Sequence, residues 1–364
     1  MIVDKNFKTV VEIFKSQLNQ NSAFGAAFAV YKNGKALIDI YGGYQNKNIL
    51  WNKNTIVNVH STGKGIVLMC ISMLIDRGIL NIDEYVHNYW PEFRQKDKQK
   101  ITVRHLLQHQ SGLYGWRKKM KVSDLLNSNY CSKLIAEQEA FHNPSEETCY
   151  HAMTIGYIIN KLFENLTNMS VGKYIKNNLV RNSNINCFIG TPKNAFNNIA
   201  RTKKIRSLKE KKSKNNDIYH KRAFQNPVVN ISDTNKKKWI TAEIPALNCH
   251  SNASSLARLY DKFNVKGKVI SYKTFKKITK IENYGIDYVL RMPIKWSSIG
   301  YIIDGGRLFG NSKKSYGHTG FGGSLAFSDP EMNISVAYTP NYFLESNLND
   351  DRVIKLIEQV YKNL

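Results

Sequence analysis

The sequence predicts a mixed α/β (α+β) protein in which strands from both ends of the chain form one antiparallel sheet. Two pairs of short runs rich in β-branched and aromatic residues indicate hairpins: 24–31 with 36–41, and 324–328 with 334–339. Between them, residues 61–198 carry apolar residues mainly at helical spacing. Strands at both ends and helices between them favour a sheet completed by the two ends, with a separate helical region.

The first elements follow from local patterns. Residues 5–20 place apolar side chains at the spacing of an amphipathic helix: Phe7, Val10, Val11, Phe14 and Leu18. Asn33-Gly34 between two strand-like runs is typical of a tight hairpin turn. We expect the second strand to leave the sheet at Gly42-Gly43-Tyr44.

The next element is a buried helix over the apolar run Ile66–Ile75. It should begin near Ser61 and end before Gly78, which suits a C-cap. Lys64 then lies one turn from Ser61 on the same face, so the two side chains should touch. A serine beside a neutral amine is an activated nucleophile, and free N–H groups at a helix start stabilise developing negative charge. The alternative is an N-cap serine followed by a solvated lysine.

Further helices are expected after Thr102, over the apolar pattern 155–162, and over 252–263 and 353–360. His105 and His109 are four residues apart, the spacing of a zinc pair. No third ligand or His-Glu-x-x-His pattern is nearby, so buried core histidines are the better interpretation.

The charge balance is unusual, because 53 Lys and Arg face 28 Asp and Glu, a net charge of +25. Residues 201–238 hold thirteen of the basic residues and only three acidic ones. We interpret 199–239 as a basic, mobile insertion that is dispensable for chemistry. Nucleic-acid binding is the alternative, but 201–214 contains no aromatic residue, so no specific nucleic-acid partner is expected.

The five cysteines are scattered singly, which suits a reducing compartment. The first residues lack the long apolar segment of a signal peptide, and no apolar run is long enough to span a membrane. These features predict a cytoplasmic protein.

Several motifs in order give the chain a family resemblance. It resembles the serine β-lactamase-like family (β-lactamase-related domain), in particular its class C-like esterase branch, over about residues 5–345. The motifs include the Ser-x-x-Lys element, which the family pairs with a later Lys-Thr-Gly. The segments that carry the resemblance are Gly42-Gly43-Tyr44, 55–65, Tyr89-Trp90-Pro91-Glu92-Phe93, 101–113, Tyr150-His151-Ala152, Glu243-Ile244-Pro245 and 317–324.

The resemblance implies a β-lactamase/transpeptidase-like fold in a single unit, residues 1–364. An antiparallel sheet flanked by helices (1–60 and 240–364) would lie beside the mainly helical part (61–198), with the active site in the groove between them.

The resemblance also implies roles for individual residues. Ser61 would be the acylated nucleophile, Lys64 its base, and Tyr150 the residue that relays protons and activates the deacylating water. A phenol needs nearby positive charge to act as a base, and Lys64 would supply it.

A second group of implied residues would line the groove. His318, Thr319 and Gly320 would lie on its edge strand. The backbone N–H of Phe321 would be the second oxyanion donor, opposite that of Ser61.

Two departures from the family pattern bear on the substrate. Ala152 stands where penicillin-recognising members have an asparagine, and His318 stands where they have a lysine. The lost groups would hold a β-lactam amide and carboxylate, whereas a neutral ester needs neither. The sequence therefore predicts a serine hydrolase that cleaves small-molecule esters or amides through an acyl-serine, without metal or organic cofactor. An acyltransferase of the same fold and a noncatalytic binding or assembly member are the alternatives. Oligomeric state and natural substrate are not indicated.

Overall fold

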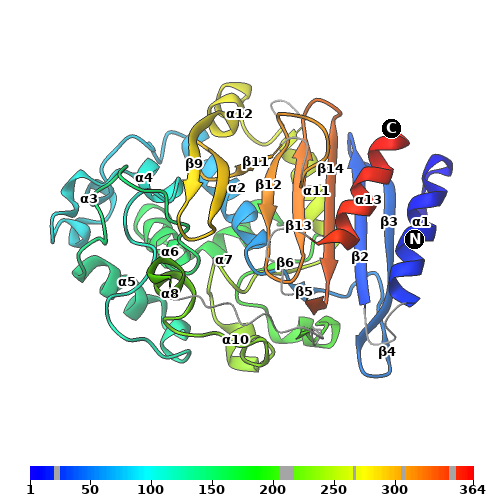
Figure 1. Cartoon of the computed structure of the whole chain (residues 1–364), viewed down its shortest axis with the longest axis horizontal. Helices are drawn as coiled ribbons and strands as arrows, with labels where there is room; N and C mark the ends of the chain where they lie inside the picture. Colours follow the sequence, from blue (N-terminus) through cyan, green and yellow to red (C-terminus); the bar gives the residue numbers. More distant parts are fainter. Residues whose placement is uncertain (20–24, 205–216, 265–267, 305–307, 344–349) are drawn as a thin grey trace.

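A computed structural model describes residues 1–19, 25–204, 217–264, 268–304, 308–343 and 350–364. Its central feature is an antiparallel sheet of ten strands, in the order β1-β3-β2-β14-β13-β12-β11-β10-β9, with β4 paired to β3. Strands that are far apart in the chain are neighbours in this sheet. For example, Val30 of β2 pairs with Val336 of β14 (Figure 1). The strands are β1 (Ile2–Val3), β2 (Gly25–Lys32), β3 (Lys35–Asn46), β4 (Ile49–Leu50), β9 (Ile281–Asp287), β10 (Met292–Ser297), β11 (Ile302–Ile303), β12 (Tyr316–Thr319), β13 (Leu325–Asp329) and β14 (Ile334–Pro340).

Helices cover both faces of the sheet. The helices α1 (Lys8–Asn19) and α13 (Asp351–Lys362) pack together on one face, and α11 (Ala253–Asn264) packs on the other against β2, β13 and β14 (Figure 1). Each follows from its apolar spacing, as in α13, where Val353, Leu356, Ile357 and Val360 are buried. The helix α12 (Tyr272–Thr279) contacts α2.

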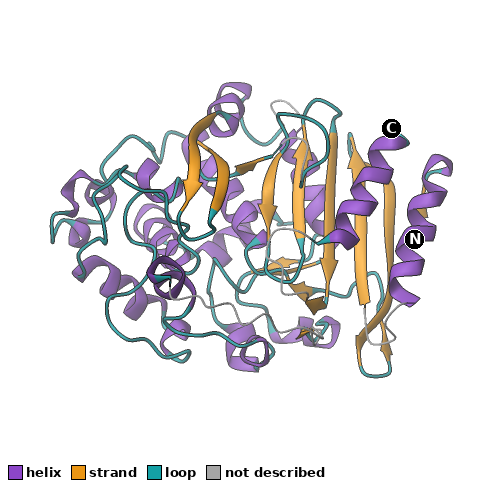
Figure 2. Ribbon diagram, in the orientation of Figure 1, coloured by secondary structure: helices purple, strands orange, loops and turns teal. Residues whose placement is uncertain are grey.

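The remaining helices gather to one side of the sheet (Figure 2). Helix α2 (Thr62–Asp76) lies between the two parts and is buried on all sides from Thr62 to Leu74, as expected for an apolar run without an amphipathic face. The others are α3 (Val86–Tyr89), α4 (Val103–Leu107), α5 (Ser128–Glu137), α6 (Thr154–Thr167) and α7 (Val171–Tyr174). Short 3₁₀ or π turns occur at Lys5–Phe7, Pro91–Phe93, Lys98–Lys100, Asp124–Leu126, Ile175–Leu179 and Lys193–Asn198.

Two expectations about strands were wrong. Strand β3 does not leave the sheet at Gly42: Gly42 and Gly43 pair with Ala26 and Gly25. A Cβ at Gly42 would approach the end of the Leu18 side chain of α1, which would have to shift.

The strand that carries His318 is not at the edge of the sheet either. Strand β12 lies between β13 and β11. However, β11 pairs only with Tyr316 and Gly317. The end of β12 that holds His318 and Thr319 therefore borders the groove from inside the sheet.

The predicted insertion 199–239 is partly folded. Its described residues include the helices α8 (Ile218–Phe224), α9 (Ile231–Thr234) and α10 (Lys237–Thr241) and the strand β7 (Lys203–Lys204). Strand β7 pairs with β15 (Tyr342–Phe343), and a further small sheet joins β5 (Val57–Asn58), β8 (His250–Ser251) and β6 (Cys187–Phe188). Residues 205–216, the most basic part of the predicted insertion, lie outside the described residues. Among the described helices, none has the length and apolar character needed to cross a bilayer.

Candidate active site

Ser61 lies between β5 and α2, and it is the N-cap residue of that helix. The sequence placed the helix start correctly. The two glycines of the first turn are explained by packing: a Cβ at Gly63 would collide with Cys249, and one at Gly65 with the Tyr260 hydroxyl. The close approach of these neighbours outweighs the low helix propensity of glycine.

Lys64 touches Ser61, as the spacing predicted. Its Nζ lies 2.8 Å from Ser61 Oγ and donates to the carbonyls of Ala152, at 2.9 Å, and Ala246, at 3.0 Å. Burial lowers the pKa of Lys64 well below its ordinary value. A neutral amine has two N–H donors and one lone pair. When Lys64 is neutral, the two carbonyls can take both donors, which leaves its lone pair for the Ser61 hydroxyl.

Lys98 shows what a buried lysine does without a hydroxyl partner. Its Nζ donates to three backbone carbonyls, those of Gln95, Ala136 and Gln138. All three donors of an ammonium group are then used, whereas the third partner of Lys64 is a hydroxyl that can give up a proton.

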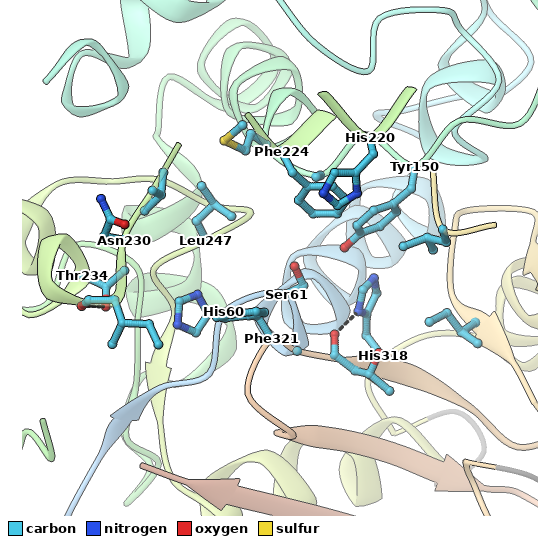
Figure 3. Close-up of a pocket in the computed structure, with 18 of the residues that line it drawn as sticks. His60, Ser61, Tyr150, His220, Phe224, Asn230, Thr234, Leu247, His318 and Phe321 are labelled. Carbon is cyan, nitrogen blue, oxygen red and sulfur yellow. Dashed lines mark hydrogen bonds between the residues drawn. The ribbon is translucent and has the colours of Figure 1, made fainter. Parts of the chain in front are cut away.

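Tyr150 lies directly across from Ser61, and its hydroxyl points toward the serine (Figure 3). Its ring stacks on Trp296, with centroids 6.0 Å apart, and lies 5.0 Å from Lys64 Nζ. Burial raises the pKa of Tyr150, with Asp287 adding to the rise and a hydrogen bond with Ser61 opposing it. Lys64 is therefore close enough to supply positive charge to Tyr150, as expected, but in the resting site burial raises the pKa of Tyr150 and disfavours the charge on Lys64.

A buried carboxylate holds the Tyr150 segment and was missed in the sequence. Asp287 Oδ1 accepts the N–H groups of Tyr150 at 3.2 Å, and of Val289 and Leu290 at 3.0 Å each. Burial raises the pKa of Asp287 to about 7. Asp287 ends β9, more than 130 residues from Tyr150, and an isolated aspartate carries no signal that would have revealed this contact.

His318 is neutral, and its hydrogen bond fixes its tautomer. Nδ1 lies 2.7 Å from the Thr319 carbonyl, which can only accept, so Nδ1 carries the proton. Nε2 is then a lone pair, and it is buried without a protein partner. Burial and the nearby Lys64 lower the pKa of His318 to about 3.

The turn after β12 is tied to the Ser61 segment. Ser324 Oγ donates to the Val59 carbonyl at 2.9 Å, and Gly320 N–H donates to the Ser324 carbonyl at 2.7 Å. A Cβ at Gly320 would collide with the same carbonyl of Val59. Phe321, next in the chain, is 38% exposed and lines the cavity beside Ser61.

His60, for which the sequence gave no role, faces Ser61 from the other side (Figure 3). It adopts a left-handed conformation (φ 46°) held by Asn58 Oδ1, which accepts its N–H. Its ring contacts the edges of Phe321 and Phe343. Burial lowers the pKa of His60 to about 3, so it is a neutral wall of the site.

His105 and His109, the two histidines considered as a zinc pair, each accept a hydrogen bond from a backbone N–H. His105 Nδ1 accepts the Thr102 N–H, and His109 Nδ1 accepts the His151 N–H. His109 is buried between Tyr150 and Trp296, as expected for a core histidine.

A cavity of about 270 Å³ opens in front of Ser61 (Figure 3). All the predicted site residues line this cavity except Lys64, which lies behind Ser61. In a chain with a net charge of +25, no Lys, Arg, Asp or Glu is found among the described residues that line it. The lining is His60, Ser61, Tyr150, Ala152, Met153, His220, Phe224, Val229, Asn230, Ile231, Thr234, Trp239, Leu247, Leu290, Trp296, Ile302, His318, Thr319, Gly320 and Phe321.

Part of this lining comes from 199–239, the stretch that we interpreted from the sequence as an insertion. His220 and Phe224 of α8 and Trp239 of α10 all face the cavity. Helix α8 is fixed by three polar contacts: Asp217 with Arg291, Tyr219 with Glu147, and Arg222 with Tyr114. The interpretation of 199–239 as an insertion separate from the site is therefore wrong for its second half, which lines the cavity. The aromatic residues of its second half were the available signal, and the basic residues around them obscured it.

The fold and the Ser61–Lys64 pair together are those of the serine hydrolases with a Ser-x-x-Lys motif. The chain belongs to the Beta-lactamase family, whose model matches residues 4–359. It is 26% identical over 367 residues to the Esterase/beta-lactamase LipL of Mycobacterium tuberculosis, covering 94% of this chain and 82% of that protein.

Solved structures agree with this assignment. A family VIII carboxylesterase is similar with a TM-score of 0.92 and 26% identity, over 100% of this chain and 99% of the other. A penicillin-binding protein homologue from Caulobacter crescentus has a TM-score of 0.93 and 26% identity, with the same coverage. The resemblance found in the sequence and the β-lactamase/transpeptidase-like fold are thereby confirmed. Serine hydrolase chemistry is supported in general, without a specific substrate.

Proposed function

We propose that the protein is an esterase that cleaves neutral, apolar esters through an acyl intermediate on Ser61. The observation that carries the proposal is the 2.8 Å contact between Lys64 Nζ and Ser61 Oγ, beside a cavity whose described lining holds no charged side chain. An uncharged cavity of this kind disfavours a charged substrate, because none of its described lining residues offers an opposite charge to offset the loss of hydration. An ester with an apolar acyl or alcohol part meets no such penalty.

The first step uses the Ser61–Lys64 pair. As Oγ attacks the ester carbonyl carbon, the hydroxyl proton moves to Lys64 Nζ, and the carbonyl oxygen becomes an oxyanion. The backbone N–H groups of Ser61 and Phe321 receive that oxyanion. The new ammonium group keeps the Ala152 and Ala246 carbonyls as partners.

The second step uses Tyr150. The ammonium on Lys64 now lies 5.0 Å from the phenol ring, so positive charge is present only when Tyr150 has to move a proton. Tyr150 passes its phenol proton to the departing alkoxide as the ester C–O bond breaks, and the Lys64 ammonium gives the serine proton to Tyr150. Acyl-Ser61, a free alcohol and neutral Lys64 result. Water then attacks the acyl carbon and gives one proton through Tyr150 to Ser61 Oγ as the bond between Oγ and the acyl group breaks, which yields the acid and free Ser61.

Intact-protein mass spectrometry with a fluorophosphonate probe tests this mechanism. We expect one adduct on the wild type and none on Ser61→Ala, with loss of p-nitrophenyl ester turnover. The matched control is Ser72→Ala on the same helix, because Ser72 is buried, donates to the Leu68 carbonyl and does not line the cavity. Lys64→Ala and Tyr150→Phe should each lower turnover about 10²-fold or more.

Two results would count against the proposal. Equal ester turnover by Ser61→Ala and wild type would place the nucleophile elsewhere. A wild type that neither labels nor turns over esters would favour the noncatalytic alternative. Product analysis with added alcohols separates hydrolysis from acyl transfer, since only the second step differs.

A further inference from the structure

Three metal-ligating side chains meet on the loop that leads into Tyr150. They are His142, Glu147 and Cys149, and one ligand atom from each lies within 4.8 Å of the others. The cluster is separate from the Ser61 cavity, since none of the three side chains lines it.

The histidine is already in the form that binds metal. His142 Nδ1 lies 2.7 Å from the Asn143 carbonyl, which must accept, so Nδ1 carries the proton. Nε2 is therefore a lone pair, and it is buried without a hydrogen-bond partner in the described structure. A protonated nitrogen held by a carbonyl is the usual support of a metal-binding imidazole.

The cysteine is paired with the glutamate. Cys149 is a free, buried thiol whose Sγ lies 3.7 Å from Glu147 Oε2, to which it donates. A cation that binds both atoms takes the place of the thiol proton between them.

The geometry is close to that of a three-ligand zinc site. Ligand atoms bound at about 2.0–2.3 Å in a tetrahedron lie roughly 3.3–3.8 Å apart, so the ligands need to close by about 1 Å. His142 and Glu147 are only partly buried, so an ion can enter from solvent. Glu147 keeps its second oxygen on the Tyr219 hydroxyl at 2.8 Å, which orients the carboxylate.

We propose that His142 Nε2, the Glu147 carboxylate and the Cys149 thiolate bind a Zn²⁺ ion, with water as the fourth ligand. Binding replaces the thiol proton, so one proton leaves for each ion bound. The sequence gave no sign of this site, because the three ligands follow no zinc-motif spacing.

Occupancy should slow ester cleavage, a consequence that rests on the proposed function. Cys149 and Tyr150 share a peptide unit, whose N–H donates to Asp287. Closing the ligands around an ion pulls on that unit and moves the phenol relative to Ser61.

The test is titration of the full chain with Co²⁺, a spectroscopic substitute for Zn²⁺. We expect about one equivalent to produce a near-ultraviolet thiolate-to-metal charge-transfer band. The band should be lost in Cys149→Ser and kept in Cys131→Ser, a control at another buried cysteine. His142→Asn should weaken binding at least tenfold. Zn²⁺ should displace the Co²⁺ band and, in weak buffer, release one proton per ion from the metal-free protein.

A band that is absent from the folded wild type, or equally strong in Cys149→Ser, would overturn the proposal. Should Cys149→Ser fail to fold, the His142→Asn affinity and the proton count still decide, because both use other variants or none. Fluorophosphonate labelling of Ser61 in the same samples reports separately on the proposed function, since Co²⁺ binding needs no turnover.

Discussion

At the scale of single residues, His318 determines what the groove can hold. Its Nδ1 proton is committed to the Thr319 carbonyl, so the nitrogen that remains offers a lone pair. A lone pair repels a carboxylate where penicillin-recognising proteins attract one. The low pKa of His318 keeps it neutral over the whole range of ordinary assays, which the sequence alone did not indicate.

We therefore expect the wild type to prefer p-nitrophenyl butyrate to nitrocefin by about 10²-fold or more in kcat/KM, since two contacts worth about 1–3 kcal/mol each are missing. His318→Lys with Ala152→Asn should shift the ratio toward nitrocefin, and Ala152→Asn alone should shift it less. Should nitrocefin be the better substrate of the wild type, the esterase proposal would lose to a β-lactamase one.

Asp287 gives a second prediction at this scale, through pH. Its pKa rises from 3.8 to about 7 in the folded protein, so below pH 4 both states hold the proton. Between pH 4 and 7 the unfolded chain loses that proton first, and the native state is destabilised by up to roughly 4 kcal/mol as the pH rises. Above pH 7 the deficit stays constant.

Asp287→Asn keeps an oxygen for the Tyr150 N–H and removes the titration. Relative to this variant, the wild type should lose stability between pH 4 and 7, as measured by urea unfolding at a series of pH values. The control is Asp97→Asn at the surface. Parallel curves for the wild type and Asp287→Asn would show that the carboxyl does not titrate in this window.

At the scale of elements, α8 links the basic stretch to the site. Phe224 lines the cavity from this helix, whereas Ile218 on the same helix is 49% exposed. Phe224→Ala should raise KM for apolar esters about tenfold, since it removes an aromatic wall worth about 1–2 kcal/mol of apolar contact. Ile218→Ala is the matched control. Equal kinetic effects of the two substitutions would mean that α8 contributes only to folding.

Elements with a strong local pattern were predictable from the sequence. Helices α1, α2 and α13 follow from apolar spacing, and both hairpins from their turn residues. The hairpin of β9 and β10 was not foreseen. Tyr284, Ile286 and Tyr288 are exposed, so its alternation does not separate an apolar face from a polar one.

The candidate site also has residues that the sequence predicts and residues that only the fold reveals. Ser61, Lys64 and Tyr150 belong to motifs that a sequence displays. Asp287, Trp296 and Trp239 reach the site only through the pairing of distant segments, and nothing in their local sequence marks them. The tautomer of His318 depends on one carbonyl contact, which spacing cannot reveal.

At the scale of the whole molecule, the excess of basic residues is separated from the cavity in front of Ser61. The net charge of +25 lies outside a cavity whose described lining is uncharged. Retention on heparin should fall steeply with salt, because surface contacts with polyanions are screened. KM for a neutral ester should change less than about twofold between low and high salt. A large salt effect on KM would place charged groups at the substrate.

The pairing of β2 with β14 has a consequence for biosynthesis. Strand β2 is made early, but its second neighbour emerges from the ribosome roughly 300 residues later, which takes about 15–60 s at ordinary rates of translation. During that time the hairpin of β2 and β3 presents an open edge whose side chains, Ala26 to Tyr31, are all buried in the finished fold. Such an edge readily pairs with other nascent chains. Production of this protein should therefore depend on chaperones that cover its first hairpin until the last strands are complete.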